Sequence, residues 1–278
     1  MNFPRPLVSA FLFVVLPITA QQITAQETKR AEPQRDQQAV DILRQALVVA
    51  GGEQAVNAVS DYRATGRLIS YQSKDQELQG TVTLTGRGVH QFRMDENLPA
   101  GVRSHSVSEG RTTKMGEDGV VVKPRAEGAA IPSSDAFLHI APMFPGGLAF
   151  PHLQLAAALK SERFSISYTG VVEIEGRRLH DVRVQRALAG RFDVSGDMSK
   201  YRTTDFFIDV VTLQVVMTEN LVPYDVVRRI RYSDYKGMSG VLVPFSIGEE
   251  LGGQKIRTIQ LDQIGFNTGL QDSNFEIR

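Results

Sequence analysis

Hydrophobic and polar residues alternate along most of the chain with the period of two that is typical of β-strands. The alternation is clearest at residues 78–85, 164–174 and 241–247, where apolar residues share one parity and mostly polar residues the other. In the second run Phe164, Ile166, Tyr168, Val172 and Ile174 share a parity, so we expect them on one face. Turn sequences such as Gly-Arg-Gly at 86–88 and Gly-Gly at 252–253 separate the runs. The pattern predicts about eleven to thirteen strands in one continuous antiparallel sheet.

The last long strand breaks this alternation twice. Ile256 is followed by Ile259 and Leu261, and then by Ile264 and Phe266, so the apolar parity changes at each step. A shift of parity within one strand indicates a β-bulge, which bends the sheet. We therefore predict a sheet that curls into a barrel or half-barrel.

Two segments have helical periodicity instead. Asp36 is a candidate N-cap for a helix that ends at the glycine pair 51–52, and a shorter helix is expected over 53–59. Residues 133–160 form the most apolar part of the chain after its N-terminal segment, with a Pro/Gly loop between two helical stretches, the second over 151–159. These helices either plug the concave face of the sheet or form a lid over an apolar cavity, and the sequence leaves both alternatives open.

The N-terminus differs from the rest. Arg5 precedes an almost wholly apolar run at 7–20, which is too short to span a bilayer and suits the core of a signal peptide. We expect residues 1–25 to be removed on export and residues 26–38 to form a flexible polar leader. Residues 39–278 then form a single domain, whose lack of cysteine excludes disulfides and a lipid-modified N-terminal cysteine.

Composition and motifs indicate no catalytic or metal site. The 31 basic and 31 acidic side chains balance, which argues against a nucleic-acid partner. The five histidines lack the spacing of a metal site; only His139 and His152, which flank the apolar loop, are worth checking. Glu249 and Glu250 lie next to a turn, and we expect them to be solvated. For the cluster of Arg228, Arg229 and Arg231 we favour a solvated strand end over contact with an anionic lipid headgroup or an acidic partner.

The C-terminal third resembles a known family in its turn and strand-end residues. Residues 207–213 read FIDVVTL, residues 232–236 read YSDYK, residues 243–245 read VPF, and Asn267 precedes the ending DSNF at 272–275. This series is similar to the periplasmic lipoprotein-carrier (LolA-like) superfamily, in particular to its uncharacterised bacterial relatives. The resemblance implies an unclosed antiparallel β half-barrel of the α+β class, mostly β, with helices on its concave face. It also implies non-enzymatic binding of acyl chains or lipoproteins. Val210 stands where that hairpin commonly has proline.

The leading hypothesis is a periplasmic carrier or binding protein for a lipid, a lipoprotein acyl chain or another apolar ligand. The alternative is a module that senses or binds envelope proteins without a small-molecule ligand. We predict no enzyme activity, cofactor, metal or membrane-spanning segment in the processed chain. The residues expected to line the concave face are large and apolar: Phe137, Phe144, Phe150, Leu153, Phe164, Ile166, Tyr168 and Phe245.

Overall fold

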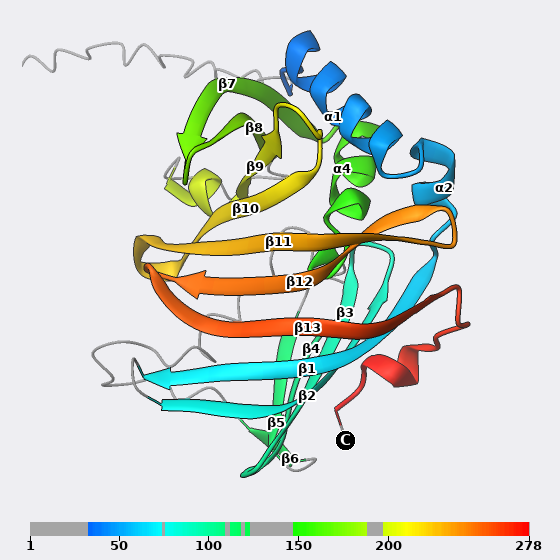
Figure 1. Cartoon of the computed structure of the whole chain (residues 1–278), viewed down its shortest axis with the longest axis vertical. Helices are drawn as coiled ribbons and strands as arrows, with labels where there is room; N and C mark the ends of the chain where they lie inside the picture. The colour runs from blue at the N-terminus through cyan, green and yellow to red at the C-terminus, as the bar shows by residue number, and fades with distance from the viewer. Residues whose placement is uncertain are drawn as a thin grey trace, which may run out of the picture. The chain divides into compact units, whose positions relative to one another are not determined.

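In the computed structural model, the strands form one curved sheet with helices against one of its faces (Figure 1). The structure describes residues 33–73, 76–108, 112–117, 120–122, 147–187 and 197–277. The predicted signal peptide lies outside these residues.

The sheet has 13 strands in the order β6-β5-β4-β3-β2-β1-β13-β12-β11-β10-β9-β8-β7, and every pair of neighbours is antiparallel. Two meanders are therefore joined where the first strand pairs with the last. The sheet is not closed into a barrel, which confirms the predicted antiparallel half-barrel. The strands are β1 (Asp61–Ser73), β2 (Gln76–Arg87), β3 (Gln91–Leu98), β4 (Gly101–Ser108), β5 (Thr112–Glu117), β6 (Val120–Val122), β7 (Phe164–Ile174), β8 (Arg177–Arg186), β9 (Thr203–Asp209), β10 (Val215–Val222), β11 (Val226–Met238), β12 (Val241–Leu251) and β13 (Gln254–Phe266).

The helices are α1 (Gln37–Val49), α2 (Glu53–Asn57) and α4 (Pro151–Lys160), with 3-10 turns η2 (Asp197–Arg202), η3 (Pro223–Asp225) and η4 (Asp272–Phe275). All three described α-helices fall in the segments predicted to be helical. The Asp36 side chain caps α1, as predicted, by accepting the Gln38 N–H at 2.8 Å. Residues 34–36 also pair with β7 through Ile166, so the segment predicted as a flexible leader overlaps the ordered domain from residue 34 onward.

The glycine pair after α1 fixes the helix to the sheet. The Leu242 N–H donates to the Ala50 carbonyl at 2.9 Å, which brings the end of α1 against the β11–β12 turn. Gly51 has φ of +114°, and a Cβ there would lie 2.1 Å from the Gly240 oxygen. Only glycine fits this approach, so the glycine pair both ends the helix and docks it.

The two predicted bulges in β13 are present. Ile256 is skipped between the pairs Glu249–Arg257 and Glu250–Lys255, and Asp262 is skipped between the β1–β13 pairs on its two sides. Each extra residue changes which face the following side chains occupy, which explains the observed slips of parity.

The prediction that the apolar residues of 164–174 share one face is wrong. The register of β7 against β8 shifts between Tyr168 and Gly170. Phe164 and Ile166 consequently join the main core, whereas Val172 and Ile174 pack on the opposite face, against a small cluster of Leu179, Phe207 and Met217. A shift of one residue preserves the visible parity in the sequence but reverses the face.

The motif residues that suggested the family resemblance hold turns. Asp209 accepts the backbone N–H groups of Val211 and Thr212 and so shapes the β9–β10 turn. The Asn267 side chain accepts the Ser60 N–H at 2.8 Å and donates to the Ala58 carbonyl at 3.0 Å. The Asn267 contacts join the start of β1 to the end of β13, so Asp209 and Asn267 both stabilise the fold.

Candidate ligand-binding face

The concave face of the sheet, here called the inner face, is apolar where the helices cover it. Phe206, Ile230, Ile247 and Leu68 are buried there on β9, β11, β12 and β1, in one core cluster with side chains of α1, α2 and α4. Most of α4 is buried around its whole circumference, because it packs against α1, α2 and β7. Its buried side chains include those of His152 and Gln154 as well as the apolar ones, which makes α4 an interior helix. The helix α4 therefore occupies the inner face.

The structure gathers most of the predicted ligand-lining residues in this apolar layer. Phe150, Leu153, Phe164, Ile166 and Phe245 are buried in the main core. Tyr168 is half-buried against the same core, and its hydroxyl lies 3.0 Å from Nδ1 of His180. Phe137 and Phe144 lie outside the described residues. Whether the set lines a ligand cavity stays a prediction, since each side chain also has a packing role.

The inner face also carries a set of ionisable side chains, among them Arg228 and Glu249, which the sequence pattern suggested would be solvated. We call it the inner charged belt, and its members are Arg228, Glu249, Arg257, Glu96, Arg103 and His105. The side chains of the first four are more than nine-tenths buried. Burying an ion costs several kcal/mol unless partners compensate it. Such a belt in an otherwise apolar face therefore needs a specific network.

Glu249 is the centre of that network. Its Oε1 accepts from Nε of Arg228 at 2.7 Å, and its Oε2 lies 2.8 Å from Nε of Arg257. Burial acts to raise the pKa of Glu249, but the two guanidinium groups outweigh it and hold that pKa below its ordinary value. The carboxylate is consequently ionised at neutral pH.

Arg257 extends the network across the concavity. Its Nη1 donates to Oε1 of Glu96, although β13 and β3 are separated in the sheet by β1 and β2. Glu96 also lies 3.8 Å from Nη1 of Arg103 and 4.0 Å from Nε2 of His105. The curvature of the sheet thus brings side chains from non-adjacent strands together over its inner face.

The expectation of a solvated Glu249 and a solvated Arg228 is wrong. The alternation of inward and outward positions along β11 and β12 indicated where both side chains lie. Glu249 continues the inward series Val243, Phe245 and Ile247 on β12, and Arg228 continues the series of Ile230 and Tyr232 on β11. Their charge and their nearness to turns suggested solvent, but the alternation of the strand placed them inside.

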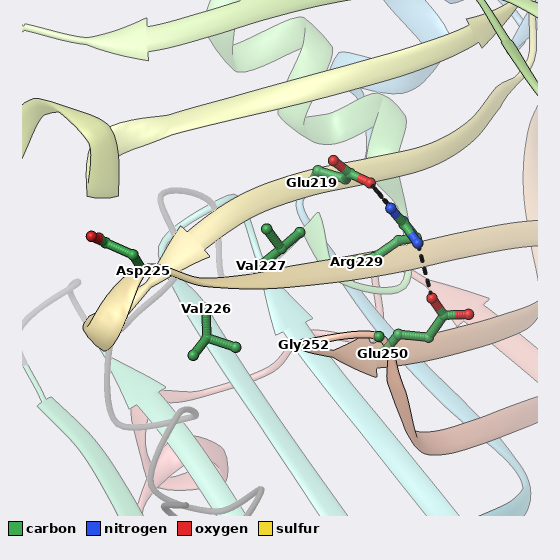
Figure 2. Close-up of a pocket in the computed structure, with 8 residues that line it drawn as sticks. Glu219, Asp225, Val226, Val227, Arg229, Glu250 and Gly252 are labelled. Atoms are coloured by element: carbon green, nitrogen blue, oxygen red, sulfur yellow. Dashed lines mark hydrogen bonds and ion pairs between the residues drawn. The ribbon is translucent and has the colours of Figure 1, made fainter.

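Neighbouring residues on the outer face carry a different arrangement, shown in Figure 2. Arg229 lies between Glu219 on β10 and Glu250 on β12. Its Nε donates to Oε1 of Glu219 at 2.6 Å, and its Nη1 donates to Oε2 of Glu250 at 3.2 Å. These residues line an open depression of about 500 Å³ together with Val226, Val227 and the glycines at the β12–β13 turn. The guanidinium is already paired on both sides, so this depression offers a ligand little beyond weak, solvent-screened contacts.

His152 is a core residue. It is fully buried on α4, with its ring 5.6 Å from that of Phe150 and 5.8 Å from that of Tyr235. Burial lowers its pKa to about 3, so the imidazole is neutral. His139 lies outside the described residues. Within the described ranges, no three His, Asp or Glu side chains are grouped as a metal site requires, and no helix has the length and apolarity needed to cross a bilayer.

No family model and no curated protein matches the sequence. Several solved structures share its fold. A DUF1329 family protein from Desulfovibrio piger has a TM-score of 0.52 and 11% identity, with 84% of this chain and 97% of that one covered. A LolA superfamily protein from Nitrosomonas europaea has a TM-score of 0.51 and 12% identity, with 84% of this chain and 97% of that one covered. An outer membrane lipoprotein-sorting protein domain from Vibrio parahaemolyticus has a TM-score of 0.50 and 10% identity, with 86% of this chain and 96% of that one covered. At these identities the likeness shows a LolA-like fold.

Proposed function

We propose that this LolA-like chain is a non-enzymatic binding or carrier protein for a lipid, a lipoprotein acyl chain or a similar apolar ligand. The observation that carries the proposal is the inner face itself. One curved, unclosed sheet presents an apolar layer on its concave side where the helices cover it, with α4 packed against it. Apolar, concave surfaces of this kind are the usual sites for apolar ligands.

The residues proposed to contact the ligand are those of the apolar layer. Phe150 and Leu153 come from α4, and Phe164, Ile166 and Tyr168 from β7, while Phe245 comes from β12. Phe137 and Phe144 belong to the same proposal. Binding requires the helices to separate from the sheet, because the side chains now bury one another. The predicted signal peptide supports action in the periplasm after residues 1–25 are removed.

Titration of the processed chain with Nile red, a neutral apolar dye, tests the proposal. We expect saturable binding and displacement by hexadecanol, and native mass spectrometry of protein purified from the cell envelope should reveal a retained lipid mass. A chain that neither binds the dye nor carries a lipid contradicts the proposal.

A further inference from the structure

Arg228 has side-chain donors that no described residue uses. Its Nε donates to Glu249, and within the described part of the chain Nη1 and Nη2 make no hydrogen bond. The side chain is only 3% exposed. A guanidinium presents five N–H groups in a planar fork, and here only the Nε group is bonded to a described residue. The two terminal amino groups can therefore donate to a further acceptor.

The position of Arg228 places it at one side of the apolar layer. Along the inner side of β11 it is followed by Ile230 and Tyr232, both buried in the main core. On β12 the carboxylate that holds it, Glu249, is followed inward by Ile247 and Phe245. A molecule lying along these strands would meet a cation at one end and apolar side chains over the rest of its length.

We propose that Nη1 and Nη2 of Arg228 bind the anionic headgroup of an amphipathic ligand, a carboxylate or a phosphate monoester, whose alkyl chain lies on the apolar layer. This inference rests on the proposed function and names the ligand class. An arginine fork matches a carboxylate or phosphate bidentately, and its strength increases away from water. Glu249 is a positioning residue, because its bond to Nε holds the guanidinium and leaves Nη1 and Nη2 unbonded among the described residues.

A structural role alone explains the pairing of Arg228 with Glu249 less well. Replacing a buried ion pair by apolar side chains of similar volume is often neutral or stabilising, so a merely structural belt has no energetic advantage. A structural role also predicts equal effects on charged and neutral ligands. The proposal predicts that only charged ligands depend on Arg228.

The test compares three ligands with the same 16-carbon chain: hexadecanoate, hexadecyl phosphate and hexadecanol, each displacing Nile red from the processed chain. In Arg228→Met the affinity for at least one anionic ligand should fall by about tenfold or more, the size of a lost charge-assisted pair. Affinity for hexadecanol should change less than about twofold. The anion that loses more identifies the headgroup as carboxylate or phosphate.

Arg229→Met is the matched control, since it removes the neighbouring guanidinium on the outer face and should leave all three affinities unchanged. Arg228→Lys keeps the positive charge and replaces the methionine variant if that variant does not fold. Its affinity for the anionic ligand should fall at least threefold, and its affinity for hexadecanol should be unchanged. Equal losses for all three ligands, or no loss, overturn the headgroup site while leaving the proposed function intact. A wild-type chain that binds none of the ligands overturns both.

Discussion

Arg228 and Arg229 are consecutive residues of β11, yet they occupy opposite environments. Arg228 is buried on the inner face with Glu249, and Arg229 lies half-exposed on the outer face between Glu219 and Glu250. The local chemistry is the same, a guanidinium next to carboxylates. On the outer face water screens the charges and the pair contributes little. On the inner face the same kind of pair is buried and costly to build, which is why we propose ligand binding on that side.

The apolar residues at 206–207 allow a direct comparison of the two faces. Phe206 is fully buried in the main core, whereas Phe207 belongs to the small outer cluster. We expect Phe206→Ala to lower the free energy of unfolding by about 3–5 kcal/mol, from lost burial and the cavity left behind. Phe207→Ala should cost less, because the smaller cluster can relax around the change. Urea unfolding followed by circular dichroism measures both, and an equal or larger loss for Phe207→Ala contradicts the assignment of the main core.

Substitutions of Glu249 and Glu250 compare the inner charged belt with the ion pairs on the outer face. Glu249→Gln leaves Arg228 and Arg257 buried without their shared carboxylate, so we expect a loss of about 3 kcal/mol in unfolding free energy. Glu250→Gln should cost less than about 1 kcal/mol, because its partners are partly exposed. The folded state lowers the pKa of Glu249. The wild type should therefore be more stable than Glu249→Gln at pH values above the ordinary glutamate pKa. This difference in unfolding free energy should decline as pH falls through the lowered pKa. Similar losses for both variants at pH 7 would show that the inner network is no more coupled than the outer one.

The sequence was sufficient for the fold but not for the charged part of the site. Alternation and turn residues predicted the antiparallel sheet, and the parity slips around Ile259 and Ile264 predicted the bulges of β13. The β7 bulge was missed because a shift at Thr169 leaves an apparently continuous apolar parity. Glu249 and Arg257 were missed because their pairing depends on how far the sheet curves, and no local pattern encodes the approach of β13 to β3.

Asp181 is a buried acidic side chain on the outer face that has, among the described residues, no compensating partner of the kind Glu249 has. It is buried on β8, and its Oδ1 makes no hydrogen bond within the described residues. Burial, together with Asp205, raises its pKa to about 6 against the partial compensation by Arg183. The folded chain therefore holds a proton that the unfolded chain releases at lower pH, and stability falls as pH rises from about 4 to 6.

Asp181→Asn removes that ionisation. We expect it to raise the unfolding free energy by about 1–2 kcal/mol at pH 7.5, with the gain vanishing near pH 4 where the wild-type carboxyl is protonated. Thermal unfolding at the two pH values measures the effect. A destabilised variant at pH 7.5 would mean that the carboxylate has a favourable partner and that burial does not dominate.

Quenching of an introduced tryptophan tests most directly whether the inner face holds the ligand. The chain contains no tryptophan, so Phe245→Trp on the inner face and Val227→Trp on the outer face each supply a single fluorophore. Fluorescence is measured as 9,10-dibromostearate is added to each folded variant, with unbrominated stearate as the blank, because bromine quenches only in near contact. The account predicts saturable quenching of Phe245→Trp and none of Val227→Trp. Quenching of the outer tryptophan alone, or of neither, contradicts a ligand-binding inner face.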